Sequence, residues 1–173
     1  MNLTEEPEIV DFAPMHYVFV EKTGPFMKIA PEAWQTLHSL SPLLKEHNQI
    51  TSGVSLYRMD PNTYRAGFAL AAEPMKLPQG LAYEKFAGGR YSKFVLTGPY
   101  SDLPAASGRA WEIVGKSGKM VRSDWAIENY VNDPMSTPPE KCVTEILIPT
   151  ERERANRAPA RIRSRVSEQT NRG

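Results

Sequence analysis

Alternating hydrophobic and polar positions predict six β-strands along this chain. The alternation is clearest at 54–57, where Val54 and Leu56 share one face and Ser55 and Tyr57 share the other. The remaining runs are rich in β-branched and aromatic residues, which strands favour. The predicted strands cover residues 9–22, 53–59, 64–72, 81–96, 125–131 and 142–148, with an interruption of the fourth at Gly88-Gly89.

Two other segments carry apolar residues at three- and four-residue steps, the spacing of an amphipathic helix. Pro31 suits a first helical turn, and we expect Pro42 to end or kink the first helix near Leu40. Asp102 can cap the second helix, and Ser117-Gly118 closes it. The apolar positions are Ile29, Ala33, Leu37, Leu40 and Leu44 in the first helix, and Leu103, Ala106, Ala110, Ile113 and Val114 in the second.

One set of markers occurs twice in the same order. The first copy is Thr23-Gly24-Pro25-Phe26, Ala33-Trp34, and Tyr57 with Asp60-Pro61; the second is Thr97-Gly98-Pro99-Tyr100, Ala110-Trp111, and Tyr130 with Asp133-Pro134. The offset is about 74 residues at the first marker and about 73 at the third. The pattern indicates a structural unit used twice. We therefore predict an α+β domain at 9–150, built from tandem strand-helix-strand-strand modules at about 9–73 and 81–150, with an antiparallel sheet and a ligand cleft at the seam.

Composition narrows the function classes. The 173 residues are 40% hydrophobic and carry a formal net charge of +1, so bulk electrostatics favours no polyanionic partner. A single cysteine, Cys142, allows no internal disulfide and fits a reducing compartment. The acidic start lacks the apolar run of a signal peptide, and no stretch approaches the roughly 18 apolar residues of a membrane span. We expect a cytoplasmic protein without a membrane segment.

The last 23 residues, 151–173, differ from the rest because they hold seven Arg against three Glu. Their large apolar residues are Ile162 and Val166, too few to offset the entropy of ordering the segment. We interpret 151–173 as a disordered tail, or a marginal helix, that could recruit a protein partner. Nucleic-acid binding is the less favoured reading, because the tail lacks interleaved aromatic residues and a motif.

Glu128 is the most informative candidate for chemistry. It lies in the strand Trp125-Ala126-Ile127-Glu128-Asn129-Tyr130, where alternation places Glu128 and Tyr130 on one face. A hairpin that closes symmetrically around its Pro-rich turn would place Glu128 opposite Glu145. Like charges facing each other destabilise a ladder unless they bind a cation or share a proton with a raised pKa. A slip of one residue would move the two acids to opposite faces.

Comparison of the two halves supports a functional role for that acid. The first-half counterpart of Glu128 is Ser55, whereas Tyr130 keeps an aromatic counterpart in Tyr57. Trp34 and Trp111 occupy equivalent places on the two helices, where they either pack in the core or wall a groove. In the second case each ring would contribute roughly 0.5–2 kcal/mol of cation–π attraction to a flat, apolar cation.

Other chemistry finds little support. His16, His38 and His47 lack metal-ligand spacing, so we expect no metal. Gly88-Gly89 lacks the surroundings of a phosphate loop, and Cys142 fits a small strand residue better than a nucleophile. We expect no cofactor.

The second-half motifs resemble a known family. They are Arg90-Tyr91-Ser92-Lys93-Phe94, Thr97-Gly98-Pro99-Tyr100, Ala110-Trp111, Glu128-Asn129-Tyr130-Val131-Asn132-Asp133-Pro134 and Thr144-Glu145-Ile146-Leu147-Ile148-Pro149. In this order they resemble the GyrI-like small-molecule-binding domain, the effector-binding module of some AraC- and MerR-type transcription regulators. The resemblance implies a ligand cleft between two helices, with Glu128 engaging cationic or polar aromatic ligands. No helix-turn-helix precedes the first strand, which makes a direct transcription activator an unfavoured expectation.

Three functions remain open from the sequence. The favoured one is a stand-alone protein that binds small amphipathic, often cationic, aromatic molecules for sequestration or sensing, through Glu128, Tyr130, Trp111, Trp34, Tyr57 and Glu145. The second is a hydrolase that opens strained or electrophilic rings, with Glu128 as general base. The third is a protein-interaction role such as topoisomerase inhibition, which the family's namesake suggests.

Overall fold

The computed structural model describes residues 1–151 and gives one antiparallel sheet with two helices. The Arg-rich segment and its predicted disorder and partner lie outside the described residues, apart from Glu151. Within 1–151 the sheet has nine strands. The strands are β1 (Asn2–Leu3), β2 (Glu8–Phe12), β3 (Met15–Thr23), β4 (Ile50–Arg58), β5 (Thr63–Leu70), β6 (Ala82–Phe86), β7 (Gly89–Thr97), β8 (Ala126–Tyr130) and β9 (Val143–Pro149). The helices are α1 (Phe26–Lys45) and α2 (Leu103–Lys116), with short 3₁₀ turns at Tyr100–Asp102 and Pro139–Lys141.

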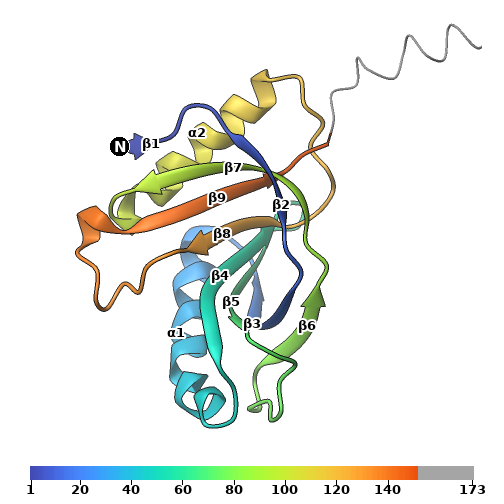
Figure 1. Ribbon diagram of the computed structural model, residues 1–173, viewed down its shortest axis with the longest axis vertical. Helices are drawn as coiled ribbons and strands as arrows, with labels where there is room; N and C mark the ends of the chain where they lie inside the picture. The colour runs from blue at the N-terminus through green and yellow to red at the C-terminus, as the bar shows by residue number, and fades with distance from the viewer. Residues whose placement is uncertain (152–173) are drawn as a thin grey trace, which may run out of the picture.

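The sheet order is β1-β7-β9-β8-β4-β5-β3-β6, and β2 pairs with β7 outside this path. The element order β3-α1-β4-β5 recurs as β7-α2-β8-β9, and the two sets join where β4 pairs with β8. In Figure 1, α1 lies beside the lower set and α2 beside the upper one. The predicted α+β class, with its antiparallel sheet and strand-helix-strand-strand order, is confirmed.

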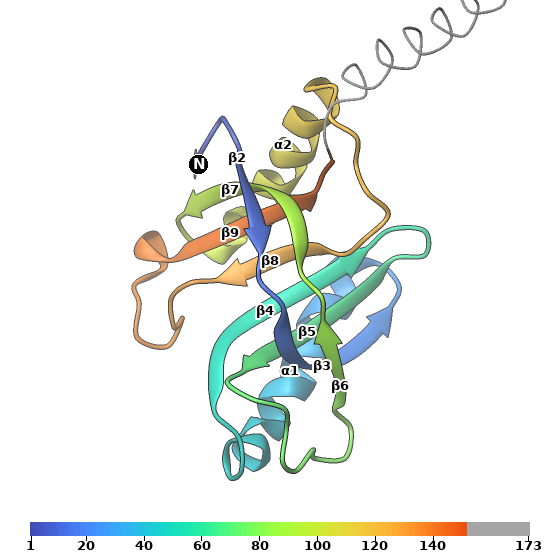
Figure 2. The same ribbon diagram turned by 45° about the vertical axis from the view of Figure 1, so that its right-hand side comes forward.

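Each half also has an additional strand, which corrects the prediction of a single strand at 9–22. The chain breaks at Ala13-Pro14, so that β2 pairs with β7 of the second half, while β6 pairs with β3 of the first. Figure 2 shows β2 crossing to run beside β7. Gly88 permits this crossing, because a Cβ there would lie 2.1 Å from the carbonyl oxygen of Phe12. The halves therefore exchange their first strands.

Helix α1 continues past Pro42 to Lys45, so the predicted end near Leu40 is wrong. Pro42 has no backbone N–H, so the His38 carbonyl lacks its usual donor in the helix. The Ser41 hydroxyl donates to that carbonyl at 2.9 Å instead. The last turn remains attached to the sheet because Leu44 is fully buried. Pro31 is also inside the helix rather than in its first turn.

Both helices cover the same face of the sheet. Helix α1 contributes Ile29, Ala33, Leu37 and Leu44 to one core, and α2 contributes Ala106, Ala110 and Val114 to another. A third core lies on the opposite face, where β2 and β6 help to cover Tyr17, Val54, Leu56, Ile127 and Leu147. Among the described residues, no helix is both long and apolar enough to cross a membrane.

Candidate functional site

The seam between the two halves is the antiparallel pair of β4 and β8. Ser55 pairs with Glu128, and Gly53 pairs with Tyr130. Glu128 also pairs with Ile146 of β9, a residue of the α2 core, so its side chain points to the face that carries the helices. The seam therefore presents Glu128, Ser55, Tyr57 and Tyr130 between the two helices.

A hydrogen-bonded network of aromatic hydroxyls surrounds this point. The Trp34 indole Nε1 donates to the Tyr64 hydroxyl at 2.8 Å, and the Trp111 Nε1 donates to the Tyr57 hydroxyl at 2.8 Å. The Ser55 hydroxyl lies 2.6 Å from the Tyr64 hydroxyl and 2.7 Å from that of Tyr130. One tryptophan from each helix is thus fixed to a tyrosine of the sheet.

The rings of the seam pack edge to face. Tyr130 makes such contacts with Trp34 and with Tyr100, both at 5.5 Å between ring centroids. Phe26 contacts Tyr57 in the same manner at 5.7 Å. These offset arrangements place positive ring edges against negative faces, which is favourable. Trp34, Trp111, Tyr100 and Tyr130 are each only partly buried, so solvent reaches the seam.

Glu128 is the charged group at the centre. Burial raises the pKa of its carboxyl group from 4.5 to about 7. No hydrogen bond between side chains of residues 1–151 uses this carboxyl group, yet its charge helps to raise the pKa of Tyr57, Tyr64 and Tyr130. An acid that is poorly solvated, close to three phenols and bonded to none is favourably placed to attract a cation.

Glu145 does not belong to this site, which corrects the predicted pairing. Glu145 pairs with Asn129, one residue away from the expected register, and therefore lies on the opposite face. Its carboxylate accepts a hydrogen bond from the Asn129 side-chain amide at 2.7 Å and lies 3.3 Å from the Lys93 ammonium. The register follows burial, because Ile127 then lies opposite Leu147 and both enter the third core.

Five of the six residues expected at the site do meet at the seam: Glu128, Tyr130, Tyr57, Trp34 and Trp111. The sequence reasoning missed Tyr64, Tyr100 and Phe26, and it considered Ser55 only as a counterpart. A signal existed for two of them, since Phe26 and Tyr100 are the aromatic residues of the repeated Thr-Gly-Pro-aromatic marker. Tyr64 could be found as the cross-strand partner of Tyr57 around the Asp60-Pro61 turn.

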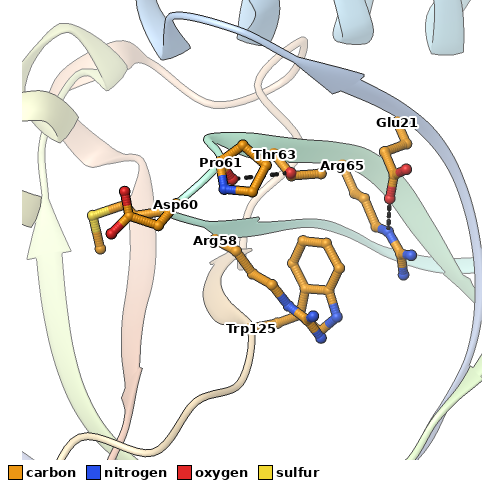
Figure 3. Close-up of a pocket in the computed structure, with 8 residues that line it drawn as sticks. Glu21, Arg58, Asp60, Pro61, Thr63, Arg65 and Trp125 are labelled. Atoms are coloured by element: carbon orange, nitrogen blue, oxygen red, sulfur yellow. Dashed lines mark hydrogen bonds and ion pairs between the residues drawn. The ribbon is translucent and has the colours of Figure 1, made fainter.

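A hollow of about 340 Å³ lies elsewhere, at the turn between β4 and β5. In Figure 3 the Arg58 guanidinium covers the Trp125 ring, at 4.0 Å from its centroid. Arg65 lies 4.3 Å from the same ring and pairs with Glu21 at 2.8 Å. Arg65 is therefore paired and stacked within this hollow, whereas the carboxylate at the seam forms no hydrogen bond with another side chain of residues 1–151.

Together, fold and site define a class: an α+β domain with a partly buried acid and aromatic side chains at the junction of two similar halves. Residues 5–151 match the GyrI-like small molecule binding domain, and the chain belongs to this family. A comparison with curated proteins gave no match.

Solved structures with the same fold are distant in sequence. The crystal structure of the EcmrR C-terminal domain is 15% identical with a TM-score of 0.69, covering 88% of this chain and 99% of that one. The protein also aligns with EcmrR in its DNA complex, where it spans 58% of the longer chain. SAV2435 bound to tetraphenylphosphonium is 16% identical with a TM-score of 0.66, covering 84% and 94%. A hydrolase from Listeria innocua is 13% identical with a TM-score of 0.57, covering 86% and 93%.

Proposed function

We propose that this protein binds amphipathic aromatic cations at the seam between β4 and β8, for sequestration or sensing. The observation that carries the proposal is Glu128, a partly buried acid among aromatic rings whose carboxyl group forms no hydrogen bond with another side chain of residues 1–151. A cation beside it would gain Coulomb attraction that water does not screen. Partly exposed Trp34 and Trp111 offer ring faces, each adding roughly 0.5–2 kcal/mol of cation–π attraction.

A structural neighbour supports this choice of ligand class. SAV2435, which shares the fold, was solved with tetraphenylphosphonium, a bulky aromatic cation. Such a cation cannot form an ordinary salt bridge with good geometry, since its charge is covered by its own phenyl groups. A partly buried acid beside aromatic rings, as at Glu128, supports the proposal that this protein binds such a cation.

Equilibrium binding of tetraphenylphosphonium, followed by calorimetry or tryptophan quenching at pH 8, tests the proposal. Glu128→Gln keeps the shape of the side chain and removes the charge, so we expect at least tenfold weaker binding. Glu145→Gln is the matched control, because the same change on the opposite face should leave the affinity unchanged. Equal affinity of wild type and Glu128→Gln would refute the site.

The pH dependence gives a second readout of the same site. The charge of tetraphenylphosphonium is permanent, so only the protein titrates. Because burial raises the pKa of Glu128 to about 7, the affinity should increase from pH 5 to pH 7 and level off above it. The profile of Glu128→Gln should be flat over this range.

A second candidate is hydrolysis of strained or electrophilic rings, with Glu128 as the base that takes a proton from water. It is favoured by the pKa of about 7, the range in which a carboxylate works well as a general base at neutral pH. Burial alone raises this pKa, without the Glu145 pairing expected from the sequence. Incubation with epoxides and other electrophilic rings, with mass spectrometry for the water-added product, distinguishes turnover from binding. The cytoplasmic location and the topoisomerase role stay predictions.

A further inference from the structure

The hydrogen-bond network at the seam contains more O–H donors than acceptors. An indole Nε1 can only donate, so the Tyr57 hydroxyl must accept the bond from Trp111. The hydroxyl of Tyr57 still carries its own proton. Among the described residues, no side-chain or backbone acceptor receives that proton, although Tyr57 is a buried residue.

The same count applies to the connected hydroxyls of Tyr64, Ser55 and Tyr130. These three hydroxyls have three protons and two bonds between them, and Tyr64 already accepts from Trp34. Whichever direction the bonds run, one proton is left without an acceptor inside the network. With Tyr57, the seam has two surplus O–H donors.

Glu128 is close to these donors without accepting their bonds. Its charge acts on Tyr57, Tyr64 and Tyr130, yet no hydrogen bond joins it to any of the three. The carboxylate is thus near the surplus hydroxyls without forming a hydrogen bond to them, so one ligand could contact both groups.

A separate observation indicates the same place. Of the buried side-chain polar atoms in residues 1–151, those without a partner are the Tyr100 hydroxyl and the Thr144 Oγ1. The Tyr100 ring contacts Tyr130, and Thr144 is the cross-strand partner of Tyr130 on β9. Two residues with an unpartnered hydroxyl therefore adjoin Tyr130, on the side of the second half.

We propose that the ligand carries an oxygen acceptor, such as a carbonyl, in addition to its cationic centre, and that the surplus hydroxyls of Tyr57 and of the Tyr64-Ser55-Tyr130 group bind this oxygen. This inference rests on the proposed function, because it assigns the polar part of the same ligand. Glu128 selects the charge, and the phenols select the acceptor. A cation that lacks an acceptor leaves buried O–H groups unpaired, which is unfavourable.

Two phosphonium cations of matched size test the inference. Triphenylphosphonium with a para-acetylphenyl group has a carbonyl oxygen, and its para-isopropylphenyl analogue has a methyl group in that place. The wild-type protein should bind the acetyl compound about three- to tenfold more tightly, the ratio expected for one neutral hydrogen bond.

Two tyrosine variants test whether the seam hydroxyls cause the preference for the acetyl compound. Tyr57→Phe and Tyr130→Phe remove one O–H each and keep the ring, so the ratio of acetyl to isopropyl affinity should fall towards one. Tyr83→Phe, at a partly exposed tyrosine that bonds His16, is the control and should keep the preference.

The outcomes separate the two proposals. If both cations bind wild type equally, or if the preference survives in Tyr57→Phe and Tyr130→Phe, the acceptor inference is overturned and the cation site stands. If neither cation binds wild type, the proposed function itself fails, and the inference fails with it. A cooperative urea unfolding transition in each variant shows that the protein is still folded.

Discussion

The raised pKa of Glu128 makes protein stability depend on pH in an unusual direction. In the unfolded chain a Glu carboxyl titrates near 4.5, whereas burial at the seam moves the pKa to about 7. Between these values the folded protein binds more protons than the unfolded chain, so the free energy of unfolding decreases as pH rises. Most paired acids act in the opposite direction, because their folded-state pKa is lowered.

The magnitude follows from the size of the shift. Each pKa unit corresponds to about 1.4 kcal/mol, so the move from 4.5 to about 7 gives a penalty of about 3 kcal/mol once both states are ionised. The penalty is absent below pH 4.5, grows between 4.5 and 7, and is constant above 7. Glu128→Gln keeps a neutral polar group at the same place and should abolish it.

Urea unfolding of wild type and Glu128→Gln at several pH values between 4 and 8 measures the difference. We expect the two free energies of unfolding to agree within about 1 kcal/mol at pH 4, and the variant to be more stable by about 3 kcal/mol at pH 8. Glu145→Gln should show the opposite sign at pH 8, with a loss of up to about 1 kcal/mol, because it breaks the partly exposed ion pair with Lys93.

A difference between wild type and Glu128→Gln that stays constant from pH 4 to pH 8 would refute the reasoning. It would mean that the carboxyl group is hydrated in the folded protein as it is in the unfolded chain. The proposed cation site would then lose its main source of affinity, since a hydrated carboxylate attracts a bulky cation only weakly. The stability experiment therefore tests the electrostatic basis of the proposed function without any ligand.

Two further substitutions test the packing of the sheet on its two faces. Gly67→Ala should destabilise the protein by about 1–3 kcal/mol in urea unfolding, because the new Cβ would lie 2.4 Å from the buried Tyr17 ring; Gly53→Ala, with 3.7 Å to its nearest neighbours, should cost clearly less. Equal costs would contradict this account of the close contact. Thr144→Val should raise thermal stability, because it removes a buried hydroxyl without a partner, at a gain of about 1 kcal/mol. The control Thr150→Val should lower thermal stability, since the Thr150 hydroxyl bonds the buried Ser92 at 2.8 Å. A loss of thermal stability in both variants would show that Thr144 has a partner such as a bound water.

The parts of the fold that sequence could predict are those set by local pattern. Both helices and the central strands follow from periodicity, and the repeated Thr-Gly-Pro-aromatic marker begins each helix. The exchange of β2 and β6 could not be predicted, because strands that pair across halves carry no local signal of their partner. The predicted helix end near Leu40 was wrong for a related reason. The hydrogen bond from Ser41 to the His38 carbonyl compensates for Pro42, and the sequence pattern does not show such a contact.

The residues of the candidate site could be predicted from the sequence, but the strand register that arranges them could not. The comparison of halves identified Glu128, Tyr130, Tyr57 and both tryptophans, all of which meet at the seam. The assumption of a symmetric hairpin placed Glu145 there as well. The turn is asymmetric, since it includes a 3₁₀ segment at Pro139–Lys141 and an Asn132 side chain that accepts a bond from the Val143 amide. A slip of one residue was enough to move Glu145 to the other face.

The β4–β8 register also gives a physical reason why the acid occurs in one half alone. Ser55, which the sequence comparison equates with Glu128, is also its direct partner across the seam. A second Glu at that position would place two buried carboxyl groups opposite each other, and at most one could ionise. Ser55 instead contributes a small hydroxyl that connects Tyr64 and Tyr130. Because equivalent positions of the two halves face each other at this seam, a single carboxylate is possible only if the two halves carry different residues there. The difference between Ser55 and Glu128 is therefore a condition for the proposed cation site.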